Sequence, residues 1–148
     1  MGSTTNLRYL LDTSILVHYV RGNELGLRIE DKYSLKSALV APLISAVTEG
    51  ELRSLALQFG WGSEKRKSLE AIVSHFVVVQ LDMPGVYDAY AAIDHFSRQS
   101  GIPMGKNDIW IAATAKVTGV CLLTTDKDFD HLSPSYLVRD YIAPDFHK

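Results

Sequence analysis

Residues 8–20, with the sequence RYLLDTSILVHYV, decide the fold class. The first four form a short apolar run without helical spacing, which predicts a strand. The next three, beginning with Asp12, are residue types that favour the N-cap of a helix, and residues 15–20 then follow helical spacing. A strand that passes directly into a helix is typical of an α/β fold.

The same alternation of strand and helix continues along the chain. Further helices are predicted at residues 23–33, 46–59, 63–75, 86–99 and 107–117, and further strands at 39–45, 76–81, 120–124 and 137–142. The β-branched run at 76–81 predicts a buried strand, and the alanine-rich helix at 107–117 predicts burial on every side. Strands separated by helices indicate a single α/β domain with a mainly parallel central sheet and helices on both faces.

Length and composition exclude several classes of protein. The chain has 148 residues, of which 47% are apolar, and this suits one domain, expected at residues 7–148 after a disordered leader or expression remnant at 1–6. A single cysteine, Cys121, excludes a disulfide framework and suits the cytoplasm. No apolar run is long enough to span a membrane. The net charge of -2 gives no general attraction to nucleic acid, so any polyanion must be held locally.

Three aspartates stand where strands and helices are expected to meet. Asp12 ends the first strand and Asp108 opens the apolar helix, and each position also suits a structural carboxylate at a helix N-terminus. Asp126 follows the strand at 120–124. The carboxyl ends of strands in an open α/β sheet are where ligands bind, so these positions also suit a functional site.

Glu51 lies on the predicted core stripe of the helix at 46–59. At about 100° per residue it projects between Val47 and Leu55, within the arc that also holds Leu52 and Phe59. A carboxylate on a buried stripe is costly unless it is paired, protonated or bound to a metal ion. The helical phase therefore indicates a functional role for Glu51.

Two other aspartate motifs, a calcium-binding loop and a phosphatase motif, are excluded by the residues at their remaining positions. Asp126, Asp128 and Asp130 resemble the start of an EF-hand loop, but His131 stands where that loop needs glycine. Phosphatases of the haloacid dehalogenase type carry a D-x-D motif. The residue two after Asp12 is Ser14, so the second aspartate of that motif is missing here.

Four segments, LLDTSIL, ISAVTEGEL, KNDIWIAATA and LLTTDKDF, together resemble the acidic motifs of PIN-domain nucleases, and most of all the VapC-type toxin ribonucleases. The match spans residues 10–129. The resemblance implies a PIN-like fold and a catalytic, metal-binding set of four acids, namely Asp12, Glu51, Asp108 and Asp126. It also implies that hydroxyl or amide groups support these acids or their bound waters, at Thr13, Ser14, Asn107 and Thr124.

Two of the four acids have competing neighbours. Glu49 competes with Glu51, but its helical phase directs it toward Arg53 as a surface charge. Asp128 competes with Asp126, which we favour because it lies closer to the strand end, and Asp128 is interpreted as a supporting residue or turn cap.

Converging carboxylates repel one another, which favours a bound divalent cation. Oxygen ligands, without cysteine or a histidine motif, indicate Mg²⁺ or Mn²⁺ rather than Zn²⁺. Such a site suits hydrolysis of an RNA phosphodiester bond by water, leaving a 5′ phosphate and a 3′ hydroxyl.

RNA must then be held by a local basic rim, for which Lys106 and Arg53 are the candidates, with the basic run at 64–67 as a weaker option. Tyr87 and Tyr90 suit a core or dimer stripe better than base stacking. The resemblance further implies an RNA substrate, a small antitoxin partner and a homodimer. Two alternatives stay open: a catalytically silent PIN-fold module that binds RNA or protein, and a receiver or phosphatase domain that uses Asp12 as phosphoacceptor.

Overall fold

The computed structural model describes residues 7–144, and its first strand passes into its first helix as predicted. Strand β1 (Tyr9–Leu11) ends at Asp12, and helix α1 (Thr13–Arg21) begins at the next residue. The Asp12 carboxylate accepts a hydrogen bond from the backbone N–H of Thr13 at 2.7 Å, which caps the helix. The leader or remnant expected at 1–6 lies outside the described residues.

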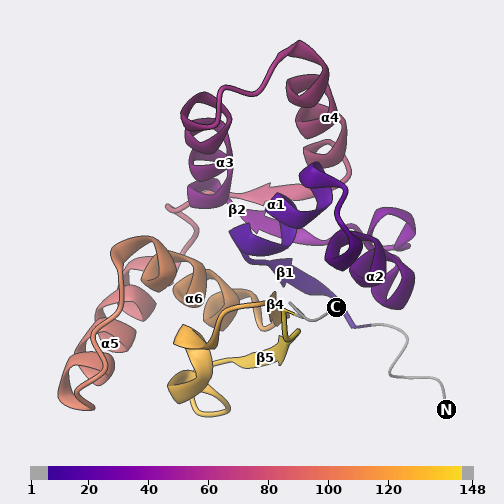
Figure 1. The fold of residues 1–148 in the computed structure, drawn as a ribbon. Coiled ribbons are helices and arrows are strands. Elements are labelled where there is room, and N and C mark those ends of the chain that lie inside the picture. The colour runs from indigo at the N-terminus through magenta and orange to yellow at the C-terminus, as the bar shows by residue number, and fades with distance from the viewer. Residues whose placement is uncertain (1–6, 145–148) are drawn as a thin grey trace, which may run out of the picture.

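Five strands form one sheet in the order β3-β2-β1-β4-β5, and every neighbouring pair is parallel (Figure 1). In the central strand, Leu10 stands opposite Leu43 on one side and Leu122 on the other. The remaining strands are β2 (Leu43–Ser45), β3 (Val77–Val79), β4 (Cys121–Thr124) and β5 (Val138–Tyr141). The prediction of an α/β fold with a mainly parallel sheet is confirmed, since the whole sheet is parallel.

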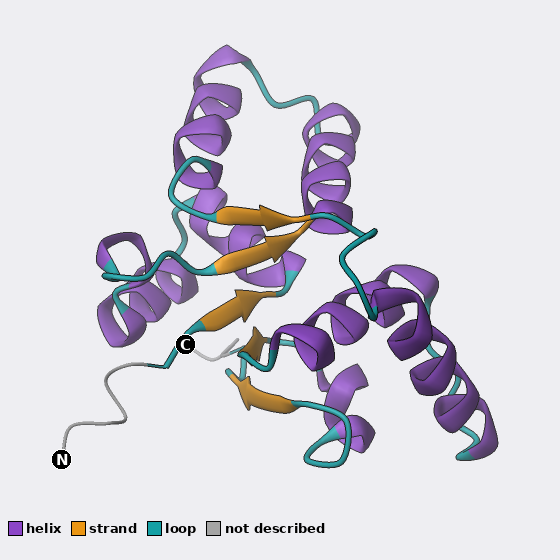
Figure 2. Ribbon diagram, turned by 180° about the vertical axis from the view of Figure 1, so that it is seen from behind, coloured by secondary structure: helices purple, strands orange, loops and turns teal. Residues whose placement is uncertain are grey.

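Helices cover both faces of this sheet (Figure 2). Consecutive strand residues point to opposite faces, and Leu10 and Leu11, both fully buried, enter two different cores. Leu11 packs with residues of α1 to α4, and Leu10 with residues of α5 and α6. These helices are α2 (Glu24–Tyr33), α3 (Ala46–Gln58), α4 (Ser63–Val73), α5 (Val86–Gln99) and α6 (Lys106–Thr118), with 3₁₀ turns η2 (Leu35–Ser37) and η3 (Lys127–Leu132).

Two predictions about burial are wrong. β3 is an edge strand, and the side chain of Val77 is 46% exposed. A β-branched run favours a strand, but it does not show whether that strand lies at the centre or the edge of a sheet. α6 is buried on most of its surface but not on every side, because Lys116 is exposed and Trp110 is half-buried.

The parallel arrangement brings four segments to one edge of the sheet. Asp12 follows β1, α3 begins directly after β2, and Asp126 lies two residues beyond the end of β4. α6 leads into β4 and runs against it, so the first turn of α6 lies at this same edge (Figure 1). Among residues 7–144, no helix combines the length and the hydropathy needed to cross a bilayer.

Candidate active site

Asp12 is both a helix cap and the most buried carboxylate of the edge, with 5% of its surface exposed. Its Oδ2 atom accepts hydrogen bonds from Thr124 Oγ1 at 2.7 Å and from Ser14 Oγ at 3.3 Å. Burial raises the pKa of the Asp12 carboxyl to about 6, an effect that these hydrogen bonds oppose and the nearby Asp126 increases. Helix capping therefore does not explain why a second carboxylate, that of Asp126, lies close enough to raise the pKa of Asp12.

Glu51 of α3 is held from two other elements, one of them α1 through Thr13, the residue after Asp12. Its Oε1 atom accepts a hydrogen bond from Thr13 Oγ1 at 2.5 Å, and its Oε2 atom accepts one from Asn107 Nδ2 at 3.0 Å. The Thr13 hydroxyl also lies 3.0 Å from Thr48 Oγ1. We call Asp12 and Glu51 the inner pair, because neutral side chains from neighbouring elements fix the carboxylates of both.

The predicted phase of α3 is wrong in detail. The buried side of this helix consists of Thr48, Leu52 and Ala56, whereas Glu51 is half-buried and Phe59 is 50% exposed. Glu51 thus lies on the flank of the core stripe rather than within it. Glu49 does point toward Arg53, as expected, and pairs with it at 2.7 Å.

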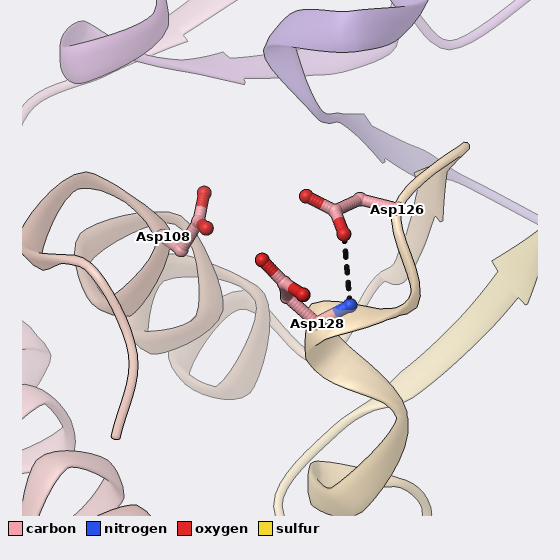
Figure 3. A group of neighbouring side chains, drawn as sticks. All are labelled: Asp108, Asp126 and Asp128. Atoms are coloured by element: carbon pink, nitrogen blue, oxygen red, sulfur yellow. Dashed lines mark hydrogen bonds between the residues drawn. The ribbon is translucent and has the colours of Figure 1, made fainter. Parts of the chain in front are cut away.

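Three further carboxylates, from α6 and from the segment after β4, point toward one another (Figure 3). Asp108, Asp126 and Asp128 each offer one oxygen atom, and these atoms lie within 4.8 Å of one another. The backbone N–H of Asp128 donates to Asp126 Oδ1 at 2.9 Å, and that of Asp126 donates to Thr124 Oγ1 at 2.9 Å. We call these three residues the outer trio.

The charges of the two groups act on one another most clearly at Asp108. Burial raises the pKa of its carboxyl to about 7, with further contributions from Asp12, Asp126, Asp128 and Glu51. The pKa of Asp128 is also raised, by burial and by Asp126. Carboxylates that raise each other's proton affinity in this way form one electrostatic unit, which a cation would stabilise.

The donor set fits a hard divalent cation. Two oxygens bound to one Mg²⁺ at 2.0–2.1 Å lie at most about 4.2 Å apart, and the ligand atoms of the outer trio already lie within 4.8 Å of one another. Among residues 7–144, the group of side chains that could hold a metal ion contains neither cysteine nor histidine, which favours a cation that prefers oxygen ligands.

The proposed supporting residues all lie within hydrogen-bonding distance of an acid. Thr13, Ser14 and Thr124 contact the inner pair, and Asn107 contacts Glu51. Thr48, which extends the Thr13 contact, is not among the sequence candidates, although it lies three residues before Glu51 in the segment ISAVTEGEL that carries the resemblance.

The two candidates for RNA binding differ. Lys106 is exposed at the first position of α6, beside the acids. Arg53 is paired with Glu70 at 2.5 Å and with Glu49, so its guanidinium is already engaged. The tyrosines Tyr87 and Tyr90 pack against the Trp110 ring, with centroid distances of 6.1 and 4.2 Å.

Comparison with known proteins identifies the family. The PIN domain matches residues 9–133. Ribonuclease VapC4 of Mycobacterium tuberculosis is 34% identical over 88 residues, which cover 58% of this chain and 67% of that protein.

Two solved structures share the fold. VapBC2 from Rickettsia felis bound to a promoter DNA fragment has a TM-score of 0.77 at 18% identity, over 91% of this chain and 98% of that chain. VapBC-5 from M. tuberculosis, a member of the VapBC family of toxin–antitoxin systems, has a TM-score of 0.63 at 22% identity, over 93% and 98%. The chain therefore belongs to the PIN domain family and is related to a VapC ribonuclease within it, as its four acidic motifs predict.

Proposed function

We propose that this chain is a Mg²⁺- or Mn²⁺-dependent endoribonuclease that acts as the toxin of a toxin–antitoxin pair. Membership of the PIN domain family and the relationship to ribonuclease VapC4 support a nuclease that acts on RNA. The observation that carries the proposal is the convergence of Asp108, Asp126 and Asp128, whose ligand atoms lie within 4.8 Å of one another. Burial raises the pKa of Asp108 to about 7, and the charges of the surrounding acids raise it further.

In this proposal Asp12, Glu51, Asp108 and Asp126 are the catalytic acids. These four acids, together with Asp128 of the outer trio, would hold the cation, and a bound Mg²⁺ or Mn²⁺ would supply Lewis-acid polarisation of the phosphate and acidify the attacking water. The geometry that supports Asp126 also supports Asp128, because both carboxylates face Asp108 (Figure 3).

The remaining residues of the site prepare these acids. The Thr124 hydroxyl donates to Asp12 and accepts from the backbone of Asp126, so it fixes one acid of each group relative to the other. Thr13 and Asn107 orient Glu51 from two sides. Because these side chains are oriented before the substrate binds, they need less rearrangement during the reaction.

An RNA substrate and a small antitoxin are the proposed partners, with a homodimer as the proposed assembly. VapBC-5, which shares this fold, belongs to a family of toxin–antitoxin systems. An unrestrained nuclease turns over many RNA molecules, so a partner that blocks it is expected.

Incubation with RNA tests the proposal. The wild-type protein should cleave single-stranded or structured RNA in Mn²⁺ and not in excess EDTA, and the products should carry 5′ phosphates, because water is the nucleophile. Mass spectrometry of the products measures this.

The Asp12→Asn protein is the control, because asparagine keeps a capping oxygen and removes the charge. Cleavage by this variant at the wild-type rate, or products ending in a cyclic phosphate, would contradict the proposed mechanism.

A further inference from the structure

A groove of about 500 Å³ opens directly beside the candidate active site. One face of α3 forms most of its wall, and Asn107 from the first turn of α6 closes one end. Glu51 lines the groove and belongs to the inner pair, and Asn107 donates a hydrogen bond to it at 3.0 Å. The groove and the acidic site are therefore continuous.

The chemistry of the wall suits the uncharged part of a nucleotide. Val47 and Leu55 are half-buried and present apolar surface to the groove. Ser54 and Gln58 present a hydroxyl and an amide, which are joined by a hydrogen bond of 2.9 Å. None of the described residues that line the groove is lysine or arginine, so it offers no site for a phosphate.

Gly50 lies in the middle of this wall, at an exposed interior position of α3. Glycine destabilises a helix interior relative to alanine. No packing neighbour requires glycine here, since a Cβ atom at this position would meet no atom within 4 Å beyond its two chain neighbours and the backbone of α3. Packing thus leaves Gly50 unexplained, whereas an open groove accounts for it.

We propose that this groove binds the nucleobase of one nucleotide flanking the scissile phosphate, and that Gly50 keeps it open. The inference rests on the proposed ribonuclease function. A phosphate at the acids would place the adjoining base at the mouth of the groove, where Val47 and Leu55 contact its faces and Gln58 its polar edge. Unstacked bases of single-stranded RNA are recognised through such contacts.

The test combines a groove-filling variant with a substrate that lacks one base. Gly50→Leu extends a side chain from the middle of the groove wall, where a Cβ atom would meet no atom within 4 Å beyond its chain neighbours and the backbone of α3. Ala71→Leu, at an exposed position of α4, adds the same side chain elsewhere and serves as the matched control. Each protein is assayed on a short single-stranded RNA cleaved by the wild type, and on versions with an abasic nucleotide on either side of the cleavage site.

For the wild type and Ala71→Leu, loss of one flanking base should lower kcat/KM about tenfold. Gly50→Leu should cleave intact RNA with a KM raised by a similar factor, and the abasic nucleotide should change its kcat/KM less than about twofold. Its melting temperature in EDTA should be at least that of the wild type, because leucine favours a helix interior more than glycine does. The rise of that temperature in Mn²⁺ should match the wild type, which would show that the acids are undamaged.

The same abasic penalty in Gly50→Leu as in the wild type would overturn the proposal. So would a wild-type dimer that Gly50→Leu converts to a monomer in light scattering, since the groove would then be an interface between copies. If the wild type cleaves no RNA in Mn²⁺, the proposed function itself fails and this inference with it.

Discussion

The inner pair and the outer trio carry the same charge but are held in different ways. Asp12 and Glu51 accept side-chain hydrogen bonds from Thr124, Thr13 and Asn107. Within residues 7–144, the Asp108 carboxylate accepts no such bond and faces other carboxylates. The inner pair therefore contributes to the fold as well as to the site, whereas Asp108 costs stability until a cation or a proton arrives.

Substitutions of the acids should affect the rate of RNA cleavage more than any other property. In this respect the inner pair and the outer trio should not differ. Asp12→Asn and Asp108→Asn should each lower kcat for RNA cleavage roughly 10²-fold or more, because each removes a charge from one shared site. Asp128→Asn should cost about tenfold, since Asp128 is exposed at the rim of the trio. Single-turnover cleavage in Mn²⁺ measures all three.

Glu49→Gln is the matched control for this series. It removes an acidic charge from α3, but one that faces Arg53 at the surface, so cleavage should stay near the wild-type rate. A Glu49→Gln protein as inactive as Asp108→Asn would show that overall charge, rather than the site, controls cleavage.

In the absence of metal, the free energy of unfolding should respond differently to substitutions in the inner pair and in the outer trio. Asp12→Ala removes the cap of α1 and leaves the Thr124 hydroxyl without its acceptor, which should cost about 2 kcal/mol. Asp108→Ala removes a desolvated charge and its repulsion, so its free energy of unfolding should equal or exceed that of the wild type. Urea unfolding in EDTA measures both, and equal destabilisation by the two variants would erase the distinction.

The free energy of unfolding should also depend on pH, with a smaller effect than that of the substitutions, and this dependence should come mainly from Asp108. Its folded pKa of about 7 lies above the ordinary aspartate value of 3.8, so the folded protein binds this proton more tightly than the unfolded chain. The resulting stability is fully present below about pH 4 and is lost as pH rises through about 7, with Asp12 acting likewise toward its pKa of about 6.

Urea unfolding in EDTA between pH 5 and 8, compared with Asp108→Asn, measures this contribution. The variant should show a flatter dependence of unfolding free energy on pH. A slope that is unchanged in the variant would mean that Asp108 titrates at its ordinary pKa.

The elements, and the positions of Asp12 and Asp126 after their strands, could be predicted from sequence because they depend on local signals. That the four acids act as one catalytic set stays a prediction. The capping residues after β1 and the carboxyl end of β4 gave the places of Asp12 and Asp126, and a parallel sheet brings such ends together. The membership of Asp128 in the trio depends on how η3 turns after β4, which no local pattern encodes.

The burial of individual side chains was harder to predict than the positions of the helices and strands. Glu51 was assigned to the core stripe, but α3 buries the side that carries Thr48 and leaves Phe59 half-exposed. The apolar pattern of α3 is nearly symmetrical, so its phase depends on which helices pack against it. Pairs such as Tyr33 with Asp140, 107 residues apart, lie beyond any local signal for the same reason.

Thermal unfolding with increasing Mn²⁺ tests most directly the claim that these carboxylates form one cation site. A cation that binds only the folded protein stabilises it by RT ln(1 + [M]/Kd), which is about 2.7 kcal/mol at a hundredfold excess over Kd. The wild type should follow this curve and lose the gain in EDTA, while Asp108→Asn should show little gain at the same concentrations. Equal shifts in the two proteins would contradict the account, because the ion would then bind away from Asp108.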